Sequence, residues 1–114
     1  MFETLDIFTL ARARASHAAA RQAQVARNVA NADTPGYRAR DVAPFDEVFG
    51  ATLAAGTSPA RPRTIDAGGP ESPNGNTVSL EAEMVRAVQA QRDHSRALTV
   101  YRSAMTVLRT SLGR

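Results

Sequence analysis

The 114-residue sequence has no cysteine and no tryptophan, and only 5% of its residues are aromatic. The absence of cysteine excludes disulfide bonds, thiolate catalysis and cysteine-bound metals. With so few large, rigid side chains, a thick hydrophobic core is not expected. Alanine supplies much of the 43% hydrophobic fraction, and alanine suits helices that pack closely against one another.

Lysine is also missing: all fourteen basic residues are arginine, set against eleven acidic residues, for a formal net charge of +3. The arginines are spread between acidic residues, without the cationic stripe and interleaved aromatic residues that are typical of a nucleic-acid groove. We therefore expect no nucleic-acid partner. Arginine forms bidentate pairs with carboxylates, so solvated or interface-pairing roles account better for the basic balance.

Long apolar runs are lacking as well. No uncharged apolar stretch approaches the roughly 20 residues that a membrane span requires. Residues 1–10 carry Glu3 and Asp6, where a cleaved secretion signal would need basic residues. We expect a chain without a membrane span that is cytosolic or is exported by a route that does not read such a signal.

The longest regular pattern lies in residues 79–114, which neither glycine nor proline interrupts before Gly113. Apolar residues recur there at steps of three and four, which is the period of one face of an α-helix. Ser79 is a favourable N-cap, and Glu81 and Glu83 suit the first helical turn. The predicted seam of this last helix consists of Leu80, Met84, Ala87, Gln91, His94, Leu98, Tyr101, Met105, Leu108 and Leu112.

This last helix has more apolar surface than one neighbour can cover. At 1.5 Å per residue it is about 50 Å long, which is typical of a coiled coil or a bundle. Ala90, Ala97 and Ala104 flank the seam, and Val100 and Val107 widen the apolar arc. We therefore expect contact with two or more neighbouring helices.

A second long helix is predicted over residues 5–30, beginning at Leu5. Its middle is rich in alanine, so whatever packs there comes close, and its bulky apolar residues lie near the ends. The predicted seam of this first helix consists of Phe8, Ala11, Ala15, Ala18, Gln22, Val25 and Val29.

Several stop signals coincide in residues 28–37, Asn-Val-Ala-Asn-Ala-Asp-Thr-Pro-Gly-Tyr. Asn31 is predicted in a left-handed position after the helix. Pro35 favours an extended Thr34, and Pro35-Gly36 matches the centre of a type II turn. Turn chemistry alone favours a plain helix stop that makes a sharp corner.

The middle of the chain has less regular structure. A short helix is predicted within residues 41–53, with Phe45, Val48 and Phe49 on one side, and Pro44 is suited to be its first residue. We expect these side chains to cluster against a long helix and not to line a ligand pocket. Residues 56–77 contain four prolines and four glycines, which predicts an irregular or disordered linker. Asn74-Gly75 favours a loop over a true hairpin, because no alternating strands flank it.

The predicted fold is therefore all-α, with two long terminal helices and a short helix within an irregular segment rich in proline and glycine. We divide the chain into an N-terminal helix (residues 1–32), a turn, short helix and linker (33–78) and a C-terminal helix (79–114). His17 and His94 lack further ligands at helical spacing, and no nucleophile, base and acid set or phosphate loop occurs. We expect no enzymatic activity, no cofactor and no metal.

The motif at residues 28–37 resembles the Asn-(Ile/Val)-Ala-Asn-x-x-Thr-Pro-Gly-Tyr signature of the flagellar axial proteins, the rod, hook and hook-associated family of bacterial flagella. The continuation at residues 38–42, Arg-Ala-Arg-Asp-Val, is similar to the proximal-rod members. Residues 75–84 and 108–110 also resemble the entry to, and the end of, the C-terminal helix in that family. The residues carrying the turn signature are Asn28, Asn31, Asp33, Thr34, Pro35, Gly36 and Tyr37.

This resemblance implies a structural subunit of the proximal rod of the basal body, which transmits torque from the motor to the hook and filament. The two terminal helices would pair like a coiled coil and pack among copies of the chain, other rod proteins, and the ring and export-gate components at the base. Export would use the flagellar type III system, without a cleaved signal peptide, to a periplasmic rod. The residues expected at assembly interfaces are Leu5, Phe8, Val25, Val29, Leu80, Met84, Leu98, Tyr101, Met105, Leu108 and Leu112.

From the residues alone an alternative stays open: a soluble helical adaptor or secretion chaperone that binds a partner helix. Both interpretations rest on the same feature, because two amphipathic helices and a polar middle bury too little surface to offset the entropy of ordering them. In either case much of the stability is expected to come from partners.

Overall fold

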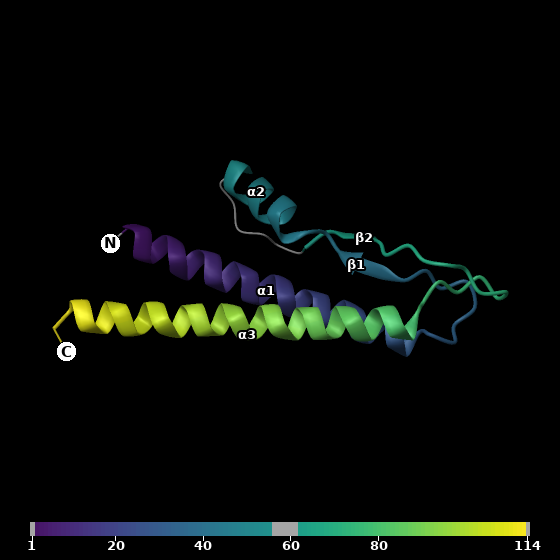
Figure 1. Ribbon diagram of the computed structural model, residues 1–114. Helices are drawn as coiled ribbons and strands as arrows, with labels where there is room; N and C mark the ends of the chain where they lie inside the picture. Colours follow the sequence, from purple (N-terminus) through teal and green to yellow (C-terminus); the bar gives the residue numbers. More distant parts are fainter. Residues whose placement is uncertain (1, 56–61, 114) are drawn as a thin grey trace.

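The computed structural model describes residues 2–55 and 62–113. Two long helices, α1 (Phe2–Ala30) and α3 (Leu80–Ser111), lie side by side and antiparallel, so that both chain ends are at the same end of the molecule (Figure 1). Between them in sequence come β1 (Arg40–Val42), α2 (Phe45–Ala55) and β2 (Thr64–Asp66). The molecule measures 63 × 28 × 16 Å, and its radius of gyration is 17.4 Å, against about 13 Å for a compact domain of about 100 residues. The long hairpin sets this elongated shape.

Small side chains form the contact between α1 and α3. On α1, Ala11, Ala18 and Val25 are buried at intervals of seven residues. On α3 the same interval gives a buried row, which we call the alanine row: Ala90, Ala97 and Ala104. A seven-residue repeat keeps one face of a helix against its neighbour, and alanine lets two backbones approach closely.

The position of the alanine row corrects the predicted seam of the last helix. Ala90, Ala97 and Ala104, expected at its flank, lie at the centre of the contact with α1. Of the predicted seam, Leu80, Met84, Gln91, Leu98 and Leu112 are exposed. Helical periodicity defines an apolar arc, but the closest approach falls where side chains are smallest, and the larger ones are displaced to the side.

The fold is mainly helical but not strictly all-α, because the middle contains a small sheet. β1 pairs antiparallel with β2, with Arg40 opposite Asp66 and Val42 opposite Thr64. The prediction of an irregular linker is therefore wrong at residues 64–66, and the prediction of a helix within residues 41–53 is wrong for the first of them. Each strand has three residues, which is too short for the alternation that reveals a strand in sequence. The part of the linker at residues 56–61 lies outside the described residues.

The short helix α2 begins later than predicted, at Phe45. Pro44 precedes it, and the Pro44 carbonyl accepts hydrogen bonds from the amides of Glu47 and Val48. The Phe45 ring stacks on Phe49, with ring centroids 5.2 Å apart. The Phe45 end of α2 contacts α1 through His17, as expected for a local cluster against a long helix.

Two residues of α1 complete this cluster. His17 meets the Phe45 ring edge-on at 5.6 Å, and the Arg14 guanidinium carbon lies 4.3 Å above the same ring. His17 Nε2 also lies 2.7 Å from the Ala43 carbonyl oxygen. Ring contacts and a cation over an aromatic face each contribute roughly 0.5–1.5 kcal/mol. Together they hold the middle segment against α1.

Candidate functional site

The turn after α1 has the predicted centre but a different helix end. The Tyr37 amide donates to the Thr34 carbonyl, and Gly36 has φ +74°, as expected for Pro35-Gly36 at the centre of a type II turn. No residue other than glycine has a positive φ in the described part of the chain. The prediction of a left-handed Asn31 is therefore wrong. Its side-chain amide instead donates to the Arg27 carbonyl at 2.8 Å, which also accepts from the Asn31 backbone amide at 3.2 Å.

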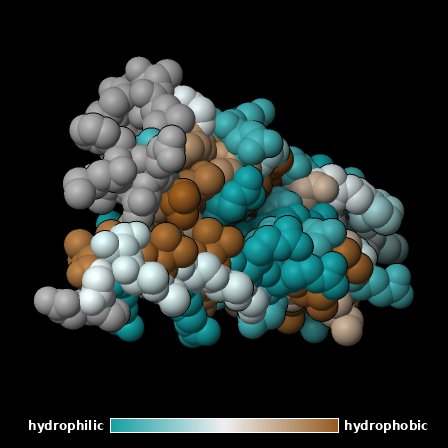
Figure 2. All heavy atoms as spheres, turned by 60° about the vertical axis from the view of Figure 1, so that its left-hand side comes forward, coloured by the Kyte–Doolittle hydropathy of each residue, from teal (hydrophilic) through white to brown (hydrophobic). Residues whose placement is uncertain are grey.

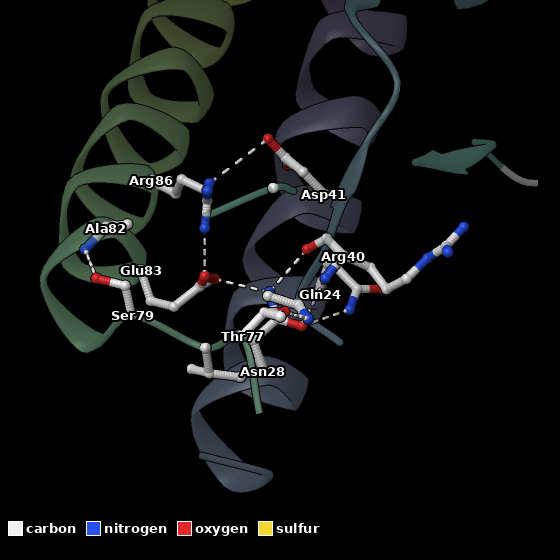
Figure 3. A network of polar contacts seen from close by, with 12 residues as sticks. Gln24, Asn28, Arg40, Asp41, Thr77, Ser79, Ala82, Glu83 and Arg86 are labelled. Atoms are coloured by element: carbon white, nitrogen blue, oxygen red, sulfur yellow. Dashed lines mark hydrogen bonds and ion pairs between the residues drawn. The ribbon is translucent and has the colours of Figure 1, made fainter. Parts of the chain in front are cut away.

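The side chain of Asn28, in the last turn of α1, is the centre of a polar network at the closed end of the hairpin (Figure 3). Asn28 is fully buried. Its Nδ2 donates to the Arg40 carbonyl and to Glu83 Oε1, both at 2.7 Å. Its Oδ1 accepts from Tyr37 Oη at 2.9 Å, from Gln24 Nε2 at 3.0 Å and from the Arg40 amide at 3.3 Å. One side chain thus joins α1, the turn, β1 and α3.

A chain of charged groups continues from Glu83, which is also fully buried. Its second carboxylate oxygen pairs with Arg86, one turn along α3. The Arg86 guanidinium reaches Asp41 on β1 at 3.7 Å. Arg21 of α1 completes the chain with two hydrogen bonds to the Asp41 carboxylate, at 3.1 and 3.2 Å. Two carboxylates therefore alternate with two arginines across three elements, which neutralises buried charge.

Residues 74–76, just before α3, contact the turn motif that follows α1. Asn76 Nδ2 donates to the carbonyls of Asn31 and Thr34, at 2.9 and 2.7 Å. The Gly36 amide donates to the Asn74 carbonyl at 2.9 Å. A Cβ atom on Gly75, whose φ is +85°, would lie 3.3 Å from Gly36 Cα. Two segments about 40 residues apart in sequence thus form one tightly packed corner.

The entry to α3 agrees with its predicted cap. Ser79 Oγ accepts from the Ala82 amide at 3.3 Å, and the helix begins at Leu80. Just before it, Thr77 Oγ1 accepts from the Ala39 amide at 2.8 Å, and the Thr77 amide donates to the Tyr37 carbonyl at 3.0 Å. At the other end, Gly113 has φ +78°, as expected for a residue that stops a helix.

The predicted interface residues divide into buried and exposed ones. Phe8 and Tyr101 are half-buried and meet edge-on at 5.0 Å, near the open end of the hairpin. Val25 is 7% exposed within the α1–α3 contact. Met105 and Leu108 are half-buried along α3. The exposed members are Val29, Leu80, Met84, Leu98 and Leu112. The side chain of Leu5 lies outside the described ones.

Exposed apolar side chains lie on both sides of the alanine row. At 3.6 residues per turn, one flank carries Leu80, Met84 and Leu98, and the other carries Val100 and Val107, all of them exposed. The second flank forms a groove of about 470 Å³ with α1, where Val100 faces Ile7 and Leu10. Figure 2, with the open end turned forward, shows apolar surface among the polar residues. Such surface is typical of proteins that pack against partners.

The turn residues Asp33 and Pro35 are exposed and belong to the corner. Sequence reasoning did not identify Glu83, Arg86, Asp41 and Arg21 as a connected group. One signal was present: Glu83 continues the seven-residue interval of the alanine row by one step. A carboxylate at a buried helix position requires a partner, although the pattern does not say which one.

Few features of catalytic or metal sites are found in the described residues. No cluster of three or more histidine, aspartate or glutamate side chains there is placed to hold a metal ion. Every buried side-chain nitrogen and oxygen within these residues has a hydrogen-bond partner. None of the helices in this part of the chain is long and apolar enough to cross a membrane.

One exposed carboxyl, that of Asp66, has a lowered pKa. The Gly68 amide donates to Asp66 Oδ1 at 2.7 Å, and Arg38 pairs with Oδ2 at 3.3 Å. The amide hydrogen bond first, and the Arg38 hydrogen bond and charge second, stabilise the ionised form and lower the pKa of Asp66 below 3.8. This carboxylate fixes the loop directly after β2.

Comparison with known proteins connects this architecture with a family. A family model described as flagella basal body rod protein matches residues 9–38, which include most of α1 and the turn motif. The flagellar basal body rod protein FlgB of Agrobacterium fabrum is 33% identical, over 81% of this chain and 81% of the relative. The chain belongs to the flagellar basal body rod protein family.

Membership confirms the resemblance drawn from the two motifs. This rod protein is a structural component of the flagellar basal body, and its family is not a family of enzymes. The matched residues 9–38 include the part of α1 that carries the buried small residues and Asn28, and they extend through the Pro35-Gly36 turn. The family signature thus covers the α1 side of the corner, and the other side, with Gly75 and Asn76, lies outside the matched residues.

Proposed function

We propose that the chain is a subunit of the proximal rod and transmits torque from the motor to the hook and filament. Family membership supports a place in the rod, and the two exposed apolar flanks of α3 carry the rest of the proposal. A lone hairpin leaves these side chains in water, whereas neighbouring helices would bury them at roughly 25 cal/mol per Å². Packing, and no catalysis, is the proposed activity.

The proposed partners are copies of the chain, other rod proteins, and the ring and export-gate components at its base. In this proposal Leu80, Met84 and Leu98 meet one neighbour, and the valines of the opposite flank meet a second. Val25, Phe8 and Tyr101 act inside the hairpin, where they hold α1 against α3. Residues 1–32, 33–78 and 79–114 then form one inner unit of the rod, because the polar network and the corner connect all three.

Export through the flagellar type III system without a cleaved signal peptide, to the periplasmic part of the rod, completes the proposal. Among the residues whose burial the structure describes, few bulky ones are buried, and the largest fully buried side chains are those of Glu83 and Asn28. A chain with so small a core unfolds readily for passage through a narrow channel and gains stability from its neighbours after export.

Leu98→Asp tests the proposal, with Thr99→Asp as its matched control. Both positions are exposed on α3, so a carboxylate has a similar effect on the isolated hairpin. Only Leu98 lies on an apolar flank. We expect Leu98→Asp to abolish incorporation into purified basal bodies and swimming, while Thr99→Asp retains both. The secretion-adaptor alternative predicts recovery of the wild-type protein from the cytosol alone. That recovery, or normal swimming of Leu98→Asp, contradicts the proposal.

A further inference from the structure

The alanine-lined part of the contact between α1 and α3 does not define its own alignment, although Phe8 meets Tyr101 near the open end and Gln22 bonds Gln91. Ala11 and Ala18 on α1, and Ala90, Ala97 and Ala104 on α3, repeat every seven residues. If α3 moved by seven residues, about 10 Å at 1.5 Å per residue, alanine would again face alanine or another small residue. Packing along this part of the hairpin therefore discriminates weakly between alignments.

One layer of the contact is different. At the closed end, the next position of the seven-residue repeat on α3 is Glu83, and it faces Asn28 of α1 across a 2.7 Å hydrogen bond. Both side chains are fully buried. Asn28 also bonds Gln24, Tyr37 and Arg40, and Glu83 also pairs with Arg86 of α3. Figure 3 shows Gln24, Arg40 and Arg86 around the pair. In any shifted alignment the amide and the carboxylate would lose each other and face apolar surface or the end of the helix.

We propose that the Asn28–Glu83 pair sets the axial alignment of the hairpin, and that it is present for this specificity more than for stability. A buried polar residue in a helix–helix contact destabilises every alignment that leaves it unpaired, and buried polar groups are known to fix register in this way. The alignment decides where the exposed flanks of α3 lie relative to α1. The inference concerns the isolated chain and does not depend on the proposed function.

The test uses two spin labels on the full chain, attached to Ala19→Cys on α1 and Thr106→Cys on α3. Both positions are exposed, and the absence of native cysteine restricts labelling to them. Pulsed electron paramagnetic resonance then measures the distance between the labels. Labelled protein is diluted into excess unlabelled protein, so that distances between molecules do not contribute. A slide by seven residues displaces one label by about 10 Å along the axis.

Three variants are compared in this labelled background. Asn28→Ala with Glu83→Ala removes the pair and extends the alanine row of α3 by one layer. Asn28→Leu with Glu83→Leu also removes it but fills the space. Glu83→Gln keeps an oxygen that accepts from Asn28 and is the conservative control. We expect one distance for wild type and Glu83→Gln. For the alanine pair we expect a second population, at least about a tenth of the molecules, displaced by about 10 Å.

A single native distance in the alanine pair would overturn the proposal, because the loop contacts of Asn76 and Thr77 would then suffice to fix the alignment. Two populations in wild type would overturn it as well. If the alanine pair lacks a helical circular dichroism signal, the leucine pair decides by the same criterion. An unfolded or singly aligned leucine pair would assign these residues a role in stability alone and would also refute the inference.

Discussion

Replacing Asn28 by alanine should destabilise the chain far more than its size suggests. The substitution removes all five hydrogen bonds of the Asn28 side chain described above. The largest loss falls on Glu83, whose Oε1 stays buried without that partner, and on the peptide groups of Arg40. An unpaired buried group costs about 1–3 kcal/mol, and more when it is charged.

Arg86 still pairs with the other oxygen of Glu83, and alanine is the better helix former by about 0.5 kcal/mol. These two effects offset part of the loss, so we expect a net decrease of about 3–5 kcal/mol in the free energy of unfolding. Stabilities of small domains lie between about 5 and 15 kcal/mol. The variant should therefore be close to unfolding at room temperature.

Asn31→Ala is the matched control within the same motif. Asn31 is only partly buried and makes local hydrogen bonds to Arg27 and Thr34, so its loss should cost about 0.5–1.5 kcal/mol. Urea unfolding followed by circular dichroism measures both variants, at several protein concentrations because association would add stability. If Asn28→Ala lies within about 1 kcal/mol of wild type, or matches Asn31→Ala, the network does not hold the hairpin.

Three further predictions concern packing, backbone and pH. Ala97→Leu should destabilise the hairpin by about 1–3 kcal/mol in urea unfolding, because Ala97 is only 3% exposed and the added atoms would crowd the α1–α3 contact. An unchanged unfolding midpoint would mean that the helices separate easily. Gly75→Ala should lower the thermal midpoint, because residue 75 has a left-handed backbone and its new Cβ would lie 3.3 Å from Gly36. Gly50→Ala, in a helix with open space around it, should raise the midpoint by the equivalent of about 0.4–1 kcal/mol. The opposite order would contradict this backbone geometry. Because the pKa of Asp66 is lowered in the folded chain, its carboxylate adds a small amount of stability above pH 3.8, and this stability is lost as the pH falls through the folded pKa. NMR titration of the Asp66 carboxyl should give a midpoint below 3.8. A higher midpoint would refute the assigned hydrogen bonds.

Much of the helical structure is predictable because its causes are local. The three-and-four spacing of apolar residues, the Ser79 cap and Gly113 define α3 to within a residue or two. The Pro35-Gly36 turn follows from the fixed φ of proline and the freedom of glycine. In each case the residues that specify the structure are neighbours in the chain, so the pattern is visible without the fold.

The parts of the site that sequence reasoning missed depend on distant pairs. β1 and β2 are three residues each and are recognised only because they pair. Glu83 and Asn28 are 55 positions apart, and nothing next to either residue names the other. The alanine row, predicted at the flank, forms the contact, and the leucine-containing seam lies beside it. The cause is similar, since periodicity gives the width of an apolar arc but not its point of closest contact.

The sequence by itself determined that this chain has two long helices, a sharp corner and too few bulky residues for a thick core, and its motifs placed it in the rod family. Only the tertiary structure decided which face of α3 meets α1, that the two motifs form one corner, and that Asn28 and Glu83 bury a shared hydrogen bond. The physical reason is the range of the interactions: periodicity, caps and turns act over a few residues, whereas packing and buried pairing depend on the folded positions of residues far apart in the chain.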